Sequence, residues 1–245
     1  MQLKSKIFDK YYSVHGKFLG GDDVITKQKW FDNLCNANYA KHIPSGGGKI
    51  LEIGCGKGHI LKWMRDRNYP NIEGVDLSPE HVEIAKKYVG INSIYRTDAS
   101  KYLLTKESTY DCIMGKDILE HIEKDELDGL LSLIRGALKP GGKIILQVPN
   151  MDWIMAQHER YMDLTHEVGF TRESLGELLR LYFDDVSILP VNYDFPSSIK
   201  TKIAFNLIKP MVIGLTRIVF EIIGAGAGNC WFEYREILGV GTKQS

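Results

Sequence analysis

The sequence predicts an α/β fold built on a doubly wound, mainly parallel sheet. Two observations support this prediction: short apolar runs alternate with helical segments from Lys49 onward, and the first run ends in a cluster of glycines. Strands that alternate with helices pair in parallel, because each helix carries the chain back across the sheet. A chain of 245 residues fits one large domain better than two.

The predicted strands are apolar runs bounded by turn-forming or helical residues. They are Lys49–Ile53, Ile72–Asp76, Ser93–Arg96, Tyr110–Gly115, Lys143–Val148, Asp185–Pro190 and Trp231–Thr242. Helices are predicted at His59–Asn68, Ser78 to about Val89, Glu123 to about Leu138 and Thr171–Tyr182. Ser78 and Thr171 suit N-cap positions, because their hydroxyl oxygens accept a backbone N–H that the helix leaves unpaired.

Charge and cysteine content exclude several classes of protein. Basic and acidic residues number 31 each, so no broad phosphate-binding surface is expected and nucleic acid is excluded as the main partner. The four cysteines form no C-x-x-C pair, which favours a reduced, cytoplasmic protein without a disulfide framework. The first residues lack the apolar core of a signal peptide.

The segment from Lys49 to Gly58 holds the most specific motif. Gly54, Gly56 and Gly58 are spaced G-x-G-x-G, which differs from the G-x-G-x-x-G pattern of dinucleotide-binding loops. Glu52 would repel a pyrophosphate and suits a cationic ligand. This motif resembles the first motif of the class I S-adenosylmethionine-dependent methyltransferases. The resemblance implies a Rossmann-like sheet of seven strands with the last one antiparallel, and a loop, including Cys55, that passes beside the methionine part of the cofactor.

Five further residues match the order of that family's motifs. Asp76 ends the second predicted strand, where a carboxylate can accept hydrogen bonds from both ribose hydroxyls; a helix-capping role is the alternative. The resemblance implies that Leu77 packs on the adenine and that Asp98-Ala99 contacts its edge. It also places Lys116, at the end of the fourth strand, beside the methyl-transfer channel.

The rest of the chain is assigned to the acceptor. Within a single domain we expect a helical cap (1–45), a cofactor-binding half (46–150) and an acceptor-binding half (151–245). Insertions at Asn150–Phe170 and Asn192–Asn229 follow the fifth and sixth strands and can cover the ligand-binding edge of the sheet. The apolar run Ile203–Ile223 is interrupted by charges, so we expect no transmembrane span. We expect an amphipathic helix packed on the acceptor side or on a second subunit, with peripheral membrane contact left open.

A hydroxyl acceptor requires a base, which histidine can supply. The segment from Arg160 to Thr171 resembles an element of methyltransferases from surface-polysaccharide biosynthesis, and within it His166 is the expected base with Asp163 as its partner. A second cluster comprises Asp117, Glu120 and His121, with Asp117 and His121 expected as i,i+4 neighbours on a helical turn. His121 is a further catalytic candidate. With His166, this cluster could also bind a divalent metal, although a base without metal is the simpler hypothesis.

These observations predict methyl transfer from S-adenosylmethionine, with S-adenosylhomocysteine as product. The main hypothesis is an O-methyltransferase acting on a sugar or sugar nucleotide in capsule or lipopolysaccharide biosynthesis. One alternative is an O-methyltransferase on a quinone precursor or another lipid-like phenol. A second alternative is a non-catalytic cofactor-binding subunit, and a homodimer stays open in each case. The N-terminal aromatics, Tyr11 among them, are interpreted as core.

Overall fold

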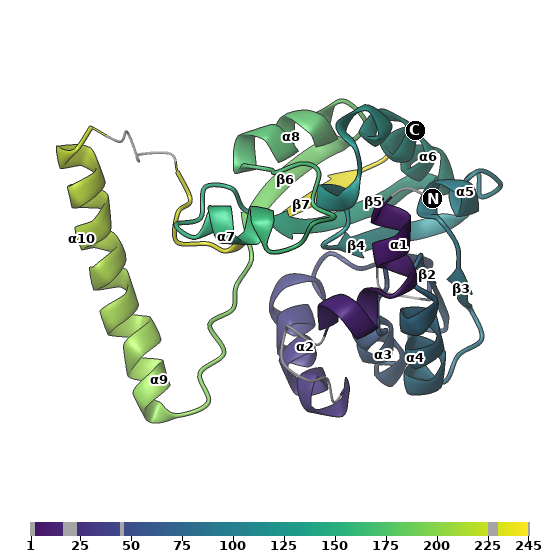
Figure 1. Cartoon of the computed structure of the whole chain (residues 1–245), viewed down its shortest axis with the longest axis horizontal. Helices are drawn as coiled ribbons and strands as arrows, with labels where there is room; N and C mark the ends of the chain where they lie inside the picture. The colour runs from purple at the N-terminus through teal and green to yellow at the C-terminus, as the bar shows by residue number, and fades with distance from the viewer. Residues whose placement is uncertain (1–2, 17–23, 45–46, 225–229, 245) are drawn as a thin grey trace.

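Seven strands form one sheet in the order β3-β2-β1-β4-β5-β7-β6 (Figure 1). The computed structural model describes residues 3–16, 24–44, 47–224 and 230–244. The strands are β1 Lys49–Ile53, β2 Asn71–Asp76, β3 Ile94–Arg96, β4 Tyr110–Lys116, β5 Leu138–Pro149, β6 Asp184–Pro190 and β7 Glu236–Thr242. The first five are parallel, and β7 is antiparallel to both neighbours. The predicted fold class is therefore confirmed.

Helices cover both faces of the sheet (Figure 1). The α-helices of the body are α1 Leu3–Asp9, α2 Val24–Asn38, α3 His59–Asp66, α4 Pro79–Val89, α5 Ala99–Leu103, α6 Leu127–Ala137, α7 Ala156–Tyr161 and α8 Arg172–Arg180. Apolar side chains of α2, α3 and α4 pack on one face, and those of α5, α6 and α8 pack on the other. Burial of two apolar layers stabilises the fold and holds the strand ends in fixed positions.

The strand order reverses between β1 and β4, which is where ligands bind in open α/β sheets. Ile53 pairs with Gly115 across this boundary, so the loops that follow both strands leave the sheet side by side. The helical cap, as far as it is described, reaches this same edge. It comprises α1, a π-helical turn at Tyr12–Gly16 and α2, while residues 1–2, 17–23 and 45 of the predicted cap lie outside the described residues.

Some predicted element ends were wrong for identifiable reasons. The last strand begins at Glu236 rather than Trp231. The Asn150 side chain donates to the carbonyls of Trp231 and Tyr234, and these bonds hold the preceding residues in a turn. The short helix α5 was not predicted; the Asp98 carboxylate caps it by accepting the Lys101 N–H at 3.0 Å.

The apolar run Ile203–Ile223 does not pack on the acceptor side, one of its two predicted positions, whereas packing on a second subunit stays a prediction. These residues belong to a continuous helix, Ile199–Ile222, formed by α9 Ile199–Ile203, a π-helical turn at Ala204–Ile208 and α10 Lys209–Ile222. We call this helix the arm. None of its residues is buried, and it stands apart from the body (Figure 1). Among the described residues it is the one helix that is long and apolar enough, by length and composition, to cross a membrane.

Candidate active site

A cavity of about 800 Å³ opens at the carboxyl edge of the strands. Its walls come from α1 and from the segments that follow β1, β2, β3, β4, β5 and the start of β7. Most of the predicted site residues line it: Gly54, Gly56, Asp76, Leu77, Asp98, Ala99, Asp117, Glu120, His121, Asp163 and His166. The cavity walls do not include the other four, which are Glu52, Cys55, Gly58 and Lys116. Thus the fold brings together residues that are more than 100 positions apart.

The glycine loop forms one end of this cavity. Gly56 has a φ of 50°, a left-handed conformation that residues with a Cβ rarely adopt. A Cβ on Gly56 would meet nothing within 4 Å, so the backbone at this position faces open space. In contrast, a Cβ on Gly58 would lie 2.6 Å from the Val89 side chain, and this glycine permits helix packing instead. The loop therefore presents bare backbone to a ligand at Gly56.

The Asp76 carboxylate is tied to this loop. One oxygen accepts the Gly56 N–H and the other accepts the Ser78 N–H, both at 2.8 Å. Asp76 therefore fixes the turn and also lines the cavity, so both of its predicted roles are compatible with the structure. Leu77, next in the chain, is 42% exposed although apolar, and it lines the same wall. Such a side chain suits a flat apolar ligand.

Glu52 lies beneath the loop rather than on the cavity wall. It is 2% exposed, and its Oε2 has no hydrogen-bond partner among the described residues. Burial, together with the nearby Asp76 charge, raises the pKa of Glu52 well above its ordinary value. Glu52 therefore does not contact the cavity directly, and any effect of its charge on a cationic ligand would have to act across the glycine loop.

Lys116 is also turned away from the cavity. Its Nζ lies 3.3 Å from the Glu236 carboxylate and pairs with Asp117. Burial lowers the pKa of Lys116, but these two acids more than offset the effect and raise it above its ordinary value. Lys116 therefore neutralises the exposed Asp117, just after β4, and the buried Glu236, at the start of β7. We expected Lys116 beside the methyl-transfer channel, but it is not part of the cavity wall.

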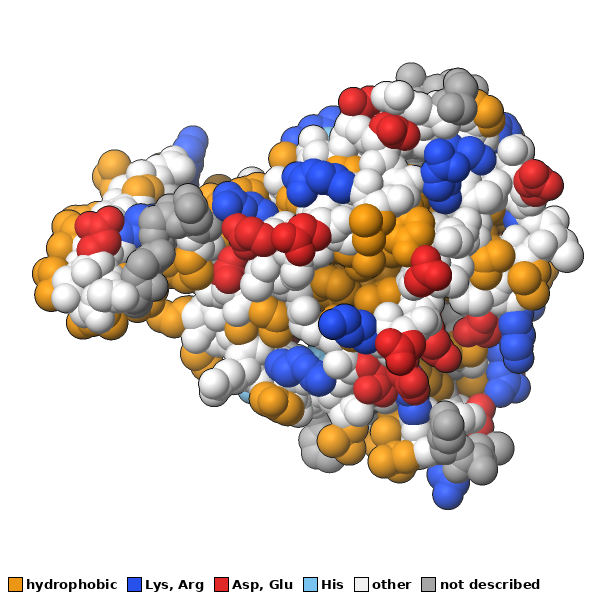
Figure 2. Space-filling model, turned by 90° about the horizontal axis from the view of Figure 1, so that it is seen from above, with side chains coloured by type: hydrophobic (Ala, Val, Ile, Leu, Met, Phe, Trp, Pro, Cys, Tyr) orange, Lys and Arg blue, Asp and Glu red, His pale blue; other side chains and the backbone are white. Residues whose placement is uncertain are grey.

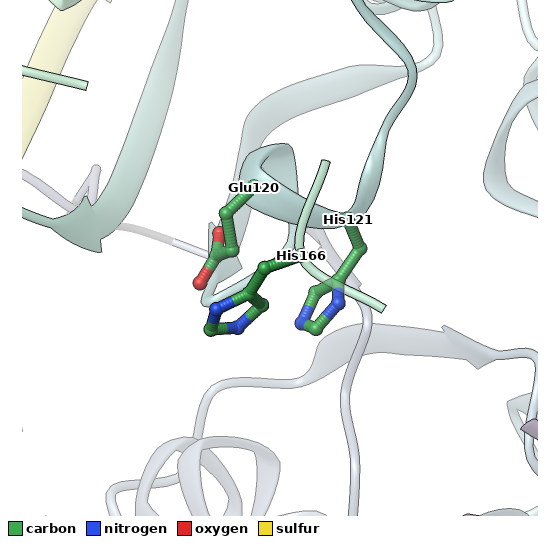
Figure 3. A group of neighbouring side chains, drawn as sticks. All are labelled: Glu120, His121 and His166. Carbon is green, nitrogen blue, oxygen red and sulfur yellow. The ribbon is translucent and has the colours of Figure 1, made fainter. Parts of the chain in front are cut away.

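Three further side chains of the cavity wall converge on one point (Figure 3). Glu120 and His121 project from a single 3-10 turn, Leu119–His121, and His166 reaches the same point from the segment after α7. One ligand atom from each lies within 4.8 Å of the others. We call these three residues the acceptor cluster, and we refer to the cluster and the glycine loop, which line the same cavity, as its two ends.

Backbone hydrogen bonds bring these two segments together. The Glu120 carbonyl accepts the Glu167 N–H at 2.7 Å and the Val168 N–H at 3.2 Å. Arg160 donates to the carbonyls of His166 and Glu167, which fixes the same turn from the other side. The turn that carries His166 is therefore held to Glu120 by main-chain bonds and is braced by the Arg160 side chain.

The hydrogen bonds of the two histidines define which ring nitrogen carries a proton. His166 Nδ1 lies 2.8 Å from the Glu159 carbonyl, which can only accept, so Nδ1 is the protonated nitrogen. Thr165 Oγ1 donates to Asp163 at 2.7 Å and therefore accepts from His121 Nδ1 at 2.8 Å. Both neutral rings thus carry their lone pair on Nε2. Lone pairs on two Nε2 atoms suit either proton acceptance or metal ligation.

The electrostatics of the cluster are unusual. Both carboxylate oxygens of Glu120 are buried without a hydrogen-bond partner among the described residues. Burial and the Asp117 charge raise the pKa of Glu120 well above its ordinary value. Burial, with a smaller contribution from His166, lowers the pKa of His121 to about 4. A buried acid without a partner is costly, and a bound cation would remove that cost.

Two expected pairings were wrong. The partner of His166 Nδ1 is the Glu159 carbonyl rather than Asp163, whose carboxylate instead accepts from Tyr11 and Thr165. Asp117 has a φ of 52° and precedes the 3-10 turn, so it does not share an α-helical face with His121. It lines the cavity but is not a member of the acceptor cluster.

Sequence reasoning missed several residues of this site. Tyr11, interpreted as core, lines the cavity and donates to Asp163, and its ring lies 6.5 Å from that of His121. Thr165 and Glu159 orient the histidines. The Arg160–Thr171 motif contained Thr165 as a visible signal, but nothing in the sequence relates Tyr11 to a segment 150 residues away.

Comparison with known proteins agrees with this geometry. The sequence profile of the "Methyltransferase domain" family matches residues 27–182, more than half of the chain. A ubiquinone biosynthesis O-methyltransferase from Bartonella bacilliformis is 31% identical over 113 residues, which cover 45% of this chain and 44% of that protein. The chain spans about half the length of the curated relatives it matches.

Two solved structures share the fold. A SAM-dependent methyltransferase from Archaeoglobus fulgidus superposes with a TM-score of 0.70 at 21% identity, covering 96% of this chain and 100% of that one. A phosphoethanolamine N-methyltransferase from Haemonchus contortus, in complex with S-adenosylhomocysteine, has a TM-score of 0.66 at 15% identity and covers 100% and 61%. The chain therefore belongs to the methyltransferase-domain family.

Proposed function

We propose that this enzyme methylates a hydroxyl group of a phenolic quinone precursor or a similar lipid-like phenol. The observation that carries the proposal is the acceptor cluster, which faces the same cavity as the glycine loop. A methyl donor at the loop and a hydroxyl at the cluster would share one cavity, and holding two reactants in one orientation supplies much of the rate enhancement of a transfer reaction.

The choice of acceptor rests on the relatives and on acidity. Curated relatives from several bacteria and from a yeast carry the name ubiquinone biosynthesis O-methyltransferase. The sugar acceptor expected from the Arg160–Thr171 segment has no support among them, so the phenol replaces it as our proposal. A phenol ionises near pH 10, several units below an alcohol, and therefore needs less assistance from the enzyme.

The residues at the loop end fit S-adenosylmethionine. Gly56 offers open backbone, Asp76 offers a carboxylate that retains acceptor capacity for ribose hydroxyls, and Leu77 offers an apolar surface for adenine. Asp98 lines the same wall while capping α5. When bound, this cofactor supplies an electrophilic methyl group on a sulfonium.

The acceptor cluster fits a divalent cation. Glu120 supplies a carboxylate without a partner, and His121 and His166 supply Nε2 lone pairs fixed by hydrogen bonds at Nδ1. Metal-binding histidines characteristically donate their other N–H in this way. A cation there would act as a Lewis acid that lowers the pKa of an acceptor hydroxyl. A base without metal leaves the buried Glu120 carboxylate without a role, which is why we prefer the cation.

A substrate screen tests the acceptor. The enzyme is incubated with methyl-labelled S-adenosylmethionine and a panel of catechols, prenylated phenols and nucleotide sugars, and products are identified by mass spectrometry. We expect label on a phenolic oxygen. Label on a sugar hydroxyl alone, or on a nitrogen, would refute the phenol proposal while leaving methyl transfer intact.

Cation removal tests the cluster. After treatment with excess chelator and gel filtration, we expect turnover to fall by at least about a hundredfold and to recover on addition of Mg²⁺, Mn²⁺ or Zn²⁺. Binding of S-adenosylhomocysteine, measured by calorimetry, should not change. Full turnover in the presence of chelator would exclude the cation and leave His166 as a base.

A further inference from the structure

The arm is an amphipathic helix whose apolar side faces away from the body. Its exposed apolar side chains recur at three- and four-residue spacing and therefore share one face: Leu207, Met211, Leu215, Ile218 and Ile222, each between 54% and 78% exposed. Ile208, Val212 and Val219 widen this face and are also more than half exposed. Figure 2 shows hydrophobic side chains gathered along the outer edge of the arm. An exposed apolar surface of this size marks an interaction site.

The charged side chains of α10 that face inward are held by the two segments that join the arm to the body. Lys209 Nζ lies 2.7 Å from the Asp194 carboxylate, and Arg217 lies 2.8 Å from the Glu233 carboxylate. The Phe220 ring packs edge-on against Phe232 at 5.1 Å on the same side. These contacts fix the rotation of the helix about its axis, so the apolar side is directed outward by the fold.

From this distribution we infer that the arm lies in the surface of an anionic membrane, with its apolar side among the acyl chains. A transmembrane span would require Lys209 and Arg217 to leave their partners for hydrocarbon, which is costly. An interfacial orientation buries the apolar face and keeps both ion pairs in water. Lys200 and Lys202, exposed at the start of the arm, are suitably placed to meet anionic headgroups.

A second copy of the chain is a less suitable occupant of this surface. Helices that pair with one another use a narrow seam flanked by charged residues that select the partner. On the arm, the exposed apolar arc from Leu207 to Ile222 is wider than such a seam. Two of the three charged side chains of α10, Lys209 and Arg217, are paired with Asp194 and Glu233, and only Glu221 lies beside the arc as an exposed charge. A broad apolar arc with a single charge beside it fits a continuous apolar medium better than a paired helix.

The root of the arm is also close to the active site. A second cavity of about 300 Å³ lies there, between Tyr193 and Lys209 on one side and Glu233 and Arg235 on the other. Arg235 lines both this cavity and the main one. If the acceptor is a lipid-like phenol, the arm would place the cavity beside the membrane in which such an acceptor dissolves. That point rests on the proposed function, whereas the membrane contact does not.

Vesicle sedimentation with the full chain tests the inference. Vesicles of phosphatidylcholine and phosphatidylglycerol in equal parts should sediment the wild-type protein, and binding should weaken in pure phosphatidylcholine and at high salt. The double variant M211E/L215E, which places two charges on the apolar face, should reduce the partition coefficient by at least about tenfold. The matched control N206E adds a charge on another side of the arm and should bind nearly as well as wild type.

Two controls separate this test from the proposed function. All variants should bind S-adenosylhomocysteine with wild-type affinity in calorimetry, which shows that the body is folded and does not require the acceptor to be known. Light scattering without vesicles should give a monomer. If the wild type does not sediment with vesicles, the membrane inference is overturned. If it is a dimer that M211E/L215E dissociates, the inference is also overturned and the apolar face belongs to a second copy.

Discussion

The two ends of the cavity differ in how their polar groups are satisfied. At the glycine loop, both Asp76 oxygens accept backbone N–H groups. The Glu52 Oε2, unpartnered in the part of the chain that the structure describes, lies beneath the loop rather than on the cavity wall, so the wall at this end is complete without a ligand. In the acceptor cluster, the Glu120 oxygens are buried and unpartnered among the described residues. The glycine loop is preformed, so it can bind a ligand with little reorganisation. The acceptor cluster lacks a partner for the Glu120 oxygens, so it should bind strongly a cation that supplies one. The difference predicts that the two ends can be disrupted independently.

The largest effect is expected at the cluster. In H166N the asparagine amide can still donate to the Glu159 carbonyl, but the Nε2 lone pair is lost. We expect turnover to fall about a thousandfold, whether His166 is a cation ligand or a base, with S-adenosylhomocysteine affinity unchanged. Labelled methyl transfer and calorimetry measure the two quantities.

The matched control is H158N, which changes an exposed histidine of α7 near the cluster. It should retain wild-type turnover and affinity. If H166N also weakens S-adenosylhomocysteine binding by a similar factor, the two ends are coupled and the comparison fails.

The loop end was more predictable from the sequence than the cluster. Its signals are local: Gly54, Gly56 and Gly58 lie within five residues, and Asp76 follows at the end of the next strand in the order that the fold requires. The chemistry of such a motif depends on backbone conformation, which nearby residues determine. The sequence could not show that Glu52 and Lys116 turn away from the cavity, because their burial depends on packing from distant helices and from Glu236.

The cluster depends on contacts between distant segments. Glu120 and His121 could be named as candidates, as could His166, but their convergence results from main-chain bonds between residues 120 and 167–168. The error over Asp117 arose because a helical turn was assumed where the backbone has a positive φ. Similarly, the arm's amphipathic pattern was visible in the sequence, but its separation from the body was not, because exposure depends on the whole fold.

A pH experiment probes the loop end next. Because the pKa of Glu52 is raised in the folded protein, the folded state retains a proton there that the unfolded chain releases above its ordinary pKa of 4.5. Wild-type stability should therefore fall relative to E52Q as pH rises, by up to about 1.4 kcal/mol per pH unit until the folded pKa is reached. Urea unfolding between about pH 5 and pH 8 measures the difference in free energy of unfolding between wild type and E52Q. Titratable groups that both proteins share contribute equally and cancel in this difference. Parallel profiles would show that Glu52 is ionised in the fold.

The D76N variant directly tests the glycine-loop end of the cavity. Asparagine offers one acceptor oxygen in place of two, so either the Gly56 or the Ser78 N–H would face an amide NH₂ group. We expect S-adenosylhomocysteine to bind about 10- to 100-fold more weakly, since hydrogen bonds to a charged group are lost. Cation affinity, measured by calorimetry with Mn²⁺, should be unchanged. Loss of cation binding in D76N would contradict the independence of the two ends.

The smallest effect concerns a positioning residue, Thr165, which connects Asp163 to His121. T165V keeps the side-chain shape but removes the acceptor of the His121 Nδ1–H, so the ring is no longer fixed in the tautomer that presents Nε2 to the cluster. We expect Mn²⁺ affinity to fall about tenfold, because partners of this kind orient metal-binding histidines. T165S restores the hydroxyl and should recover most of the affinity. If Thr165 has only a packing role, T165V should lower thermal stability and T165S should not selectively restore cation binding. The pair of variants therefore distinguishes orientation of His121 from packing at a buried site.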